Sequence, residues 1–298
     1  MKMKDLTVVI RSAGERTLEL CHHLVSEQVE SSNIEIIEEK PFSQAVRKNF
    51  EIGIKKGFEY TLAVDADTLI FKDSIKLHIE NFKKLDDSYF VYKGLVYDKF
   101  FKSYRGAGIH LYRTSLLEKA IKFIPKEGDS FRPESSTYIE MQKMGFHTYQ
   151  DIWAVGIHDD EQYYQDIYRK FFLHAHKHRS RIKNMLDQWG DQWANDIDFQ
   201  FALKGISDGM MFKEAVFVDS DFFTKHFKKV KEQFNFDEKN KLKIIEFKLD
   251  QSPFLVHESN EFFDSRLPLS KKKVKAMDKF KFKTGLQLEK WANYLKKY

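Results

Sequence analysis

The sequence predicts an α/β fold in which buried strands alternate with helices. Two observations support this prediction. Short apolar runs recur at 6–10, 34–38 and 61–64, and the segments between them place apolar residues near helical spacing. Strand–helix–strand order of this kind is typical of parallel strands joined by helical crossovers. With 298 residues, the chain is long enough for one large α/β domain or for a domain with an appendage.

The first third of the chain gives the clearest element predictions. Ser43 can cap the second helix, and Gly57 suits its end because glycine adopts the left-handed conformation there. The only cysteine, Cys21, falls on the apolar side of the first helix, which indicates a buried small side chain and excludes an internal disulfide. The predicted order is strand 6–10, loop 11–14, helix 17–27, strand 34–38, helix 43–56 and strand 61–64.

The pattern continues with less regularity toward residue 182. The elements predicted there are helix 75–84, strands 89–92 and 108–112, helix 114–123, a loop over 126–136, helix 137–144, an extended segment over 146–155 and a helix within 156–182. Beyond about residue 185 the signals weaken to a mixed helical region, with candidate strands at 215–218 and 243–247.

The third strand ends in Asp65 and Asp67, which are one residue apart. Open α/β sheets bind their ligands at the carboxyl ends of strands, and a short loop there lets both carboxylates converge. Two such anions repel each other unless a cation joins them, and hard oxygen ligands suit Mg²⁺ or Mn²⁺. The pair therefore indicates a divalent-metal site that holds a phosphorylated substrate. Two ordinary surface acids at a strand end are the alternative.

Charge is distributed unevenly along the chain. Residues 270–298 contain ten lysines and two acids, whereas the remainder holds 40 basic and 43 acidic residues. A nucleic-acid enzyme more often spreads positive charge along its groove, so no nucleic-acid partner is expected. The sequence shows no secretory signal segment and no apolar run of spanning length, which predicts a cytoplasmic protein.

Four segments resemble parts of a GT-A glycosyltransferase, of the family-2-like kind that builds bacterial surface glycans: the first two resemble its nucleotide-binding half, the third its acceptor side and the fourth its late metal-binding histidine. They are Val8–Ser12, the run PFSQAVRKNFEIGIKKGFEYTLAVDAD at 41–67, Gly106–Gly108 with Arg113, and Gly156–His158. The resemblance covers roughly residues 5–170. It implies a Rossmann-like, mixed and mostly parallel sheet flanked by helices, with a helical C-terminal extension. It also implies a catalytic domain at 1–182, with a donor-binding half at about 5–105 and an acceptor and metal half at about 106–182, and an extension at 183–298.

The resemblance also implies a ligand set. Asp67 would be the main ligand of Mn²⁺ or Mg²⁺, Asp65 would contact the ribose or reach the metal through water, and His158 would complete the metal site. The donor would be a nucleotide sugar, with a UDP-sugar favoured. For His158 the alternative is a loop histidine that hydrogen-bonds to its neighbours Asp159 or Asp160.

Four further residues are candidates for the donor site. Arg11 and Ser12 would lie beside the nucleotide, and Arg47 or Lys48 would reach the diphosphate, since cations commonly bind phosphates. An ion pair with Glu15 is the alternative for Arg11. A solvated helix face is the alternative for Arg47 and Lys48.

An attacking acceptor hydroxyl must lose a proton, which inverting glycosyltransferases transfer to a carboxylate. Glu134 is the candidate base and Glu140 the reserve, so inversion is favoured over retention. The family pattern is commonly Glu-Asp with the second acid as base, and here Ser135 occupies that second position. An ordinary acid near a helix N-terminus is the alternative for Glu134.

The resemblance implies an enzyme that transfers a sugar to a hydroxyl of a glycan or lipid-linked acceptor, in the synthesis of lipopolysaccharide or a related surface polysaccharide. The tail at 270–298 interleaves lysine with apolar residues, as basic amphipathic helices on anionic membranes do. That pattern predicts peripheral binding at the inner face of the membrane. An ordinary helix docked on the catalytic domain is the alternative.

Two other functions compete with transfer. DADTL also resembles the first motif of haloacid-dehalogenase-type phosphatases, with Asp65 as nucleophile, Asp67 as acid/base and His158-Asp159-Asp160 as a late acidic pair. Two observations argue against the phosphatase. Two strand–helix units precede the motif, and Thr68 stands where a glycine often follows the second aspartate of that family. The other alternative is a non-catalytic membrane- or glycan-binding protein with a degenerate site.

Overall fold

The computed structural model describes residues 2–130, 132–214, 220–234, 236–244, 249 and 251–256. The chain divides into two compact units. The first contains the described residues of 1–161 and of 242–267, and the second contains those of 162–241. The first unit is α/β and the second is helical, which confirms the predicted class of α/β fold with a helical extension.

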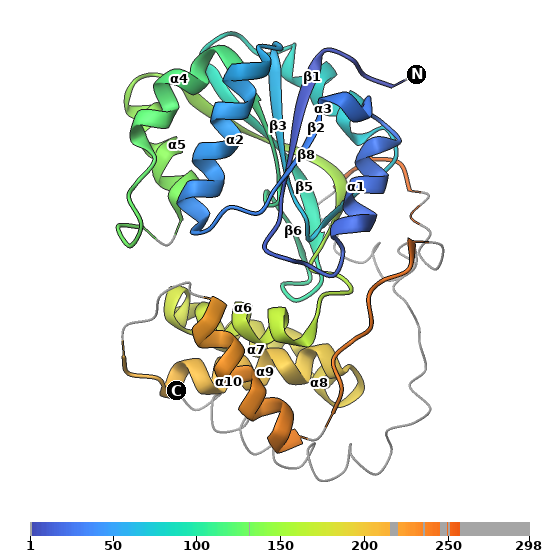
Figure 1. The fold of residues 1–298 in the computed structure, drawn as a ribbon, viewed down its shortest axis with the longest axis vertical. Coiled ribbons are helices and arrows are strands. Elements are labelled where there is room, and N and C mark those ends of the chain that lie inside the picture. Colours follow the sequence, from blue (N-terminus) through green and yellow to red (C-terminus); the bar gives the residue numbers. More distant parts are fainter. Residues whose placement is uncertain are drawn as a thin grey trace. The chain divides into compact units, whose positions relative to one another are not determined.

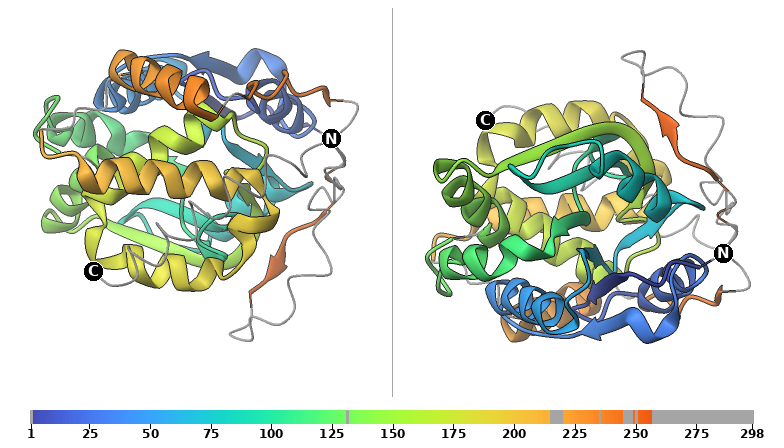
Figure 2. Two further views of the ribbon diagram at one scale, coloured as in Figure 1. Left: turned by 90° about the horizontal axis from the view of Figure 1, so that it is seen from below. Right: turned by 90° about the horizontal axis from the view of Figure 1, so that it is seen from above.

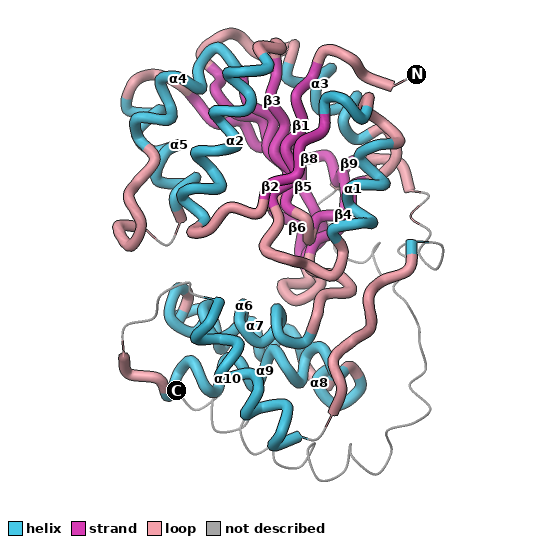
Figure 3. Tube along the Cα trace, in the orientation of Figure 1, coloured by secondary structure: helices cyan, strands magenta, loops and turns pink. Residues whose placement is uncertain are grey.

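A nine-stranded mixed sheet forms the centre of the first unit, as Figure 3 shows in magenta. The main path runs β2-β1-β3-β7-β5-β8-β4, while β6 pairs with β5 and β9 with β8. Pairs β1–β2, β1–β3 and β5–β8 are parallel, and the remaining pairs are antiparallel. The strands are β1 Leu6–Arg11, β2 Ile34–Ile37, β3 Tyr60–Asp65, β4 Thr68–Ile70, β5 Tyr89–Asp98, β6 Ser103–Arg105, β7 Ile109–Arg113, β8 His147–His158 and β9 Phe254–Leu255.

The sequence of β1 explains its central position. All six of its residues are buried, and its run of Val8, Val9 and Ile10 favours strand over helix. Both neighbours, β2 and β3, are parallel to it, as the predicted crossover helices require. The predicted order of three strands and two helices in this region is confirmed.

Helices cover both faces of the sheet (Figure 1). Apolar residues of α2, α4 and α5 form one core with the sheet, and those of α1 and α3 contribute to the other. Gly57 ends α2 with a φ of 71°, the left-handed conformation predicted for it. The helices are α1 Leu18–Ser26, α2 Phe42–Lys56, α3 Ser74–Phe82, α4 Leu117–Ala120 and α5 Pro133–Lys143.

Three predicted boundaries in the first unit are wrong. The strand predicted at 89–92 continues to Asp98, because its residues pair with both β7 and β8. The strand after Phe146 likewise runs on to His158. The loop predicted over 126–136 gives way to α5 at Pro133, since proline is well suited to the first helical position. Glu134 therefore lies in a first helical turn and not in a loop.

The second unit contains α6 Tyr164–Lys177, α7 Ile182–Trp189, α8 Gln192–Asn195, α9 Ile197–Met211 and α10 Ser220–Phe234. Figures 1 and 2 show α6 and α9 as neighbours. A side chain at Gly205 or Gly209 would collide with the α6 backbone at Tyr168 or Phe172, so these glycines permit the close packing. This packing assigns α6 to the helical unit, so the division falls after Glu161, whereas the sequence placed it at residue 182.

Some predictions concern segments that are not described. The candidate strand at 215–218, the part of the candidate strand 243–247 beyond Ile244, and the tail 270–298 lie outside the described residues. Among the helices that are described, none combines the length and the hydropathy needed to cross a membrane.

One buried histidine gives a testable prediction about stability. Burial lowers the pKa of His78 from 6.5 to about 4, and its Nδ1 lies 3.0 Å from the Ser74 carbonyl oxygen. The unfolded chain therefore binds a proton at this residue more readily than the folded chain does. We expect the contribution of His78 to the free energy of unfolding to be fully present above pH 6.5 and to be lost between pH 6.5 and 4. The expected loss is about 3 kcal/mol.

Urea unfolding at pH 7 and pH 4.5 checks this expectation. His78→Leu should reduce the pH dependence, while His23→Leu, at an exposed position of α1, should leave it unchanged. An equal pH dependence in wild type and His78→Leu would contradict the prediction.

Candidate functional site

The turn between β3 and β4 positions Asp67. The Asp65 N–H donates to the Gly108 carbonyl at 2.8 Å, and the Ala66 N–H donates to the Arg11 carbonyl at 2.9 Å. The buried Thr17 hydroxyl donates to the Ala66 carbonyl at 2.7 Å. Hydrogen bonds from three segments therefore fix the turn at the carboxyl end of β3, where sequence reasoning placed the acidic pair.

Strand pairing brings His158 and Asp159 to the same place. Thr68 of β4 pairs with His158 of β8, and the Asp159 N–H donates to the Asp67 carbonyl at 3.0 Å. Gly108 is required beside them. Its φ is +68°, and a Cβ there would collide with the Thr68 hydroxyl.

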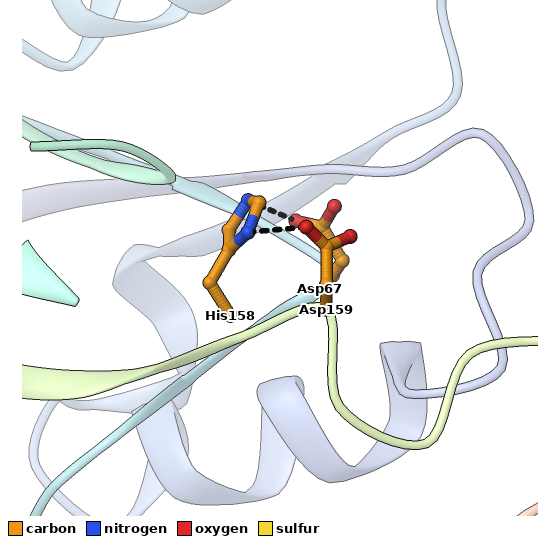
Figure 4. A group of neighbouring side chains, drawn as sticks. All are labelled: Asp67, His158 and Asp159. Carbon is orange, nitrogen blue, oxygen red and sulfur yellow. Dashed lines mark ion pairs between the residues drawn. The ribbon is translucent and has the colours of Figure 1, made fainter. Parts of the chain in front are cut away.

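Asp67, His158 and Asp159 form a compact group of potential metal ligands (Figure 4). Asp67 Oδ1 lies 3.5 Å from His158 Nε2, and Asp159 Oδ2 lies 2.6 Å from His158 Nδ1. One ligand atom from each residue lies within 4.8 Å of the other two. His158 and Asp159 are buried, and the Asp67 side chain is partly exposed although its Oδ1 atom is buried.

Asp98 contacts the Nδ1 atom of His158 and so helps to orient its ring. Its carboxylate is completely buried, and Oδ2 lies 3.1 Å from His158 Nδ1 and 2.8 Å from Arg105 Nε. Oδ1 accepts the N–H groups of Phe100 and Phe101 at 3.0 Å each. The Asp98 carboxylate at Nδ1 favours the proton on that nitrogen, which leaves the lone pair of Nε2 on the side of Asp67.

The donor set fits a hard divalent cation. Two carboxylates and one imidazole nitrogen suit Mn²⁺ or Mg²⁺, and the Asp98–His158 contact is the outer carboxylate that metal-bound histidines commonly have. Asp67, His158 and Asp159 would hold the ion. Asp65 is not part of this group, although the sequence suggested it as a metal ligand.

Asp65 instead binds Arg11. Arg11 Nε donates to Asp65 Oδ1 at 2.8 Å, and Nη2 lies 2.7 Å from the same oxygen. Arg11 Nη1 also donates to Glu134 Oε1 at 2.6 Å, so one buried guanidinium joins the ends of β1 and β3 to the first turn of α5. The pair with Glu15 that was the alternative for Arg11 does not form. Glu15 Oε2 accepts the Ser12 hydroxyl at 2.9 Å.

Glu134 lies in a dense hydrogen-bond network. Besides Arg11, its Oε1 accepts the Tyr112 hydroxyl at 2.7 Å and lies 3.2 Å from His110 Nδ1, while the Tyr138 hydroxyl is 2.6 Å from that of Tyr112. Burial alone would raise the pKa of Glu134. The charge of Arg11, with His110, outweighs burial and holds this pKa well below its usual range.

The second carboxylate oxygens remain available. Among the described residues, Glu134 Oε2 and Asp65 Oδ2 accept no hydrogen bond, because every recorded contact is made to Oε1 or Oδ1. Burial raises the pKa of Asp65, Arg11 opposes this, and Asp67 adds to the rise. Each carboxylate thus has one oxygen held by the protein and one available to a ligand.

The other predicted site residues lie apart from these two clusters. Arg47 and Lys48 are on α2, half-buried and exposed, and in the described part of the chain neither bonds to the clusters. Glu140 pairs with Lys143 at 2.7 Å on the outer side of α5. Arg113 pairs with Tyr60 at the opposite end of β3 from Asp65 and donates to the carbonyls of Leu85 and Asp86, so its place is not near the acidic pair.

Sequence reasoning named Asp159 as a neighbour of His158 but not as a metal ligand. It also missed four other contributors to the two clusters, which are Asp98, His110, Tyr112 and Tyr138. Asp98 ends the alternating run VYKGLVYD, and extending the predicted strand to it would have placed a carboxylate at a strand end. No local sequence motif distinguishes the other three residues, because they occupy ordinary positions in a strand or a helix. Cys21 is buried, and burial raises the pKa of its thiol, in agreement with a small core residue.

No family model matches the chain, and no curated protein matches it.

Several solved structures resemble the chain at low identity. A mannosyltransferase from Pyrobaculum calidifontis, solved with GDP-Man and Mn²⁺, is 12% identical with a TM-score of 0.43 over 78% of this chain and 81% of that one. A glycosyltransferase involved in glycosylation of the major capsid of PBCV-1 is 16% identical with a TM-score of 0.36 over 49% and 81%. A cytidylyltransferase from Leptospira borgpetersenii is 14% identical with a TM-score of 0.34 over 51% and 77%. Similarity at this level does not indicate a function for this chain. The function proposed below is therefore argued from the site alone.

The contact between Asp98 and His158 gives a testable prediction. Asp98→Asn keeps the size of the side chain but removes the charge behind the imidazole, so we expect Mn²⁺ affinity to fall about tenfold. Calorimetric titration of the metal measures this. Asp151→Asn, which alters a buried carboxylate on β8 bonded to Asn81, is the control and should bind Mn²⁺ as the wild type does. Equal affinity in Asp98→Asn and wild type would contradict the role of Asp98.

Proposed function

We propose that this chain is a metal-dependent glycosyltransferase that moves a sugar from a nucleotide-diphosphate donor to a hydroxyl of a glycan or lipid-linked acceptor. The observation that carries the proposal is the placement of two clusters at one end of β3. The Asp67–His158–Asp159 group suits a divalent cation, and the adjacent Arg11–Asp65–Glu134 network presents two carboxylate oxygens to a ligand.

The residues divide the chemistry between them. A bound Mn²⁺ or Mg²⁺ would neutralise charge on the leaving diphosphate. Asp65 Oδ2 is suited to accept a hydroxyl of the donor, such as that of a ribose. Glu134 Oε2 is suited to accept the proton of the acceptor hydroxyl as its oxygen bonds to the anomeric carbon and the bond to the diphosphate breaks. A base that activates the acceptor hydroxyl for displacement in line with the leaving diphosphate would give inversion, which is the outcome we favour.

The low pKa of Glu134 is compatible with its role as base. It keeps the carboxylate ionised at neutral pH, which a proton acceptor requires. A weak base suffices here because the acceptor hydroxyl becomes strongly acidic as it bonds to the anomeric carbon. The network that lowers the pKa also fixes the carboxylate in position.

The proposal changes the roles expected for the cations. Arg11 is neutralised by two carboxylates, so we assign it to positioning Asp65 and Glu134 and not to the nucleotide contact that the sequence suggested. Ser12 and the α2 residues Arg47 and Lys48 stay candidates for nucleotide contacts. Glu140 stays the reserve base, and a UDP-sugar the favoured donor.

The cellular role rests on the sequence. We propose synthesis of a surface polysaccharide such as lipopolysaccharide, at the cytoplasmic face of the membrane. The lysine-rich composition of residues 270–298 supports attraction to anionic lipid there.

A thermal-shift screen tests the donor and the metal together. A nucleotide sugar at 100 times its dissociation constant stabilises the folded state by about 2.7 kcal/mol, which corresponds to a rise of roughly 5–10 °C. We expect such a rise for one nucleotide class among UDP-, GDP-, CMP- and dTDP-sugars, only with Mn²⁺ present. Asp67→Asn should remove it, and Asp151→Asn should retain it. No rise with any of them, together with release of phosphate from generic esters, would favour the phosphatase alternative.

Transfer kinetics test the base. Glu134→Gln should lower kcat for transfer by about 10²–10⁴-fold while donor binding persists, because general-base catalysis contributes that much. Glu118→Gln, on the exposed side of α4, is the matched control and should retain wild-type transfer. A large loss in Glu140→Gln with little loss in Glu134→Gln would assign the base to Glu140.

A further inference from the structure

Lys93 lies on the same face of the sheet as the Arg11–Asp65–Glu134 network. Register places Arg11 opposite Asp65, Ala63 opposite His110, and His110 opposite Lys93, so these side chains share one face across four strands. Lys93 Nζ lies 5.9 Å from the centre of the Tyr138 ring, whose hydroxyl bonds to Tyr112 in the Glu134 network. Lys93 therefore borders the place assigned to the acceptor hydroxyl.

The ammonium of Lys93 lacks a direct counter-ion. It is half-buried, and in the described part of the chain its Nζ makes no hydrogen bond or ion pair. Burial lowers its pKa, and Glu134 is the acid that opposes this. Glu134 already pairs with Arg11 through Oε1. A partly desolvated ammonium in this setting is stabilised by an anion that a ligand brings.

The backbone at Lys93 is also irregular. The register of β5 against β8 shifts between Lys93 and Leu95, and again between Leu95 and Val96. The Gln150 amide Nε2 holds this region by donating to the carbonyls of Lys93 and Gly94 at 3.1 and 3.2 Å. Bulges of this kind redirect side chains and are common beside active sites. The irregularity is a second observation at the same residue, independent of its charge.

We propose that Lys93 and the Tyr138 ring form an acceptor subsite for a sugar that carries an anionic group, either a carboxylate or a phosphate, close to its reacting hydroxyl. The inference rests on the proposed function, because it names the acceptor class of that site. The anionic group pairs with Lys93 and the sugar ring packs on Tyr138. The hydroxyl then lies toward Glu134 Oε2, which accepts its proton during transfer.

Binding of three simple sugars to the full chain tests this subsite without any turnover. The probes are methyl glucuronide, glucose 6-phosphate and methyl glucoside, titrated by NMR with UDP and Mn²⁺ present. We expect at least one anionic probe to bind about tenfold more tightly than the neutral glucoside. A preference for the glucuronide identifies a carboxylate acceptor, and a preference for the phosphate identifies a phosphorylated one.

Variants assign the preference to Lys93. Lys93→Met should abolish it and Lys93→Arg should retain most of it, while Lys76→Met, an exposed lysine of α3, should leave it intact. The melting temperature of each variant confirms that it is folded. Equal binding of all three probes, or a preference that persists in Lys93→Met, would overturn the subsite.

Donor hydrolysis, measured separately, keeps the two proposals distinguishable. Hydrolysis without any preference for anionic probes overturns the subsite alone. A Lys93-dependent preference in a chain that never turns over a nucleotide sugar contradicts the proposed transfer and supports the anion site.

Discussion

The buried guanidinium of Arg11 is the constraint on which the site depends. A cation removed from water is strongly destabilising unless carboxylates surround it, and Asp65 Oδ1 and Glu134 Oε1 lie 2.7 and 2.6 Å from the guanidinium nitrogens. Phe42, whose ring centre lies 5.0 Å from the guanidinium carbon, adds a cation–π contact. This single charge joins β1, β3 and α5, and it requires the two carboxylates to face one another across the end of the sheet.

The same ion pairs use only one oxygen of each carboxylate and, within the described part of the chain, leave the other oxygen without a hydrogen bond. Because Arg11, Tyr112 and His110 all bond to Glu134 Oε1, the carboxylate is held in one orientation without use of Oε2. Asp65 shows the same asymmetry toward Arg11. Fixed carboxylates need little reorganisation when a ligand arrives, which is the arrangement that positions reacting groups well. The oxygens that the protein holds and the oxygens that we propose to contact ligands therefore belong to the same two side chains.

The sequence predicted what local patterns determine. The apolar runs that form β1, β2 and β3, the glycine that ends α2, and the position of Asp67 at a strand end are readable within a few residues. The contacts between residues far apart in the sequence could not be predicted in this way. Arg11 bonds to Glu134 across 123 positions, and Asp98 contacts His158 across 60. The parallel pairing of β5 with β8 sets Asp98 opposite His158, and the packing of α5 against the sheet brings Glu134 to Arg11. No local periodicity encodes either arrangement.

Backbone conformation gives an independent reason to regard the Asp67–His158–Asp159 group as a functional site. Asp159 and Glu161 have φ values of 62° and 56°, which residues other than glycine rarely adopt. Other contacts hold them there. The Asp159 N–H bonds to Asp67, and Arg16 Nη1 donates to both the carbonyl and Oε2 of Glu161, at 2.9 and 2.6 Å. Strained conformations that neighbouring contacts maintain are concentrated at ligand sites. A loop selected only for stability would place glycine at these positions, whereas a carboxylate at Asp159 supplies a ligand atom where the strand ends.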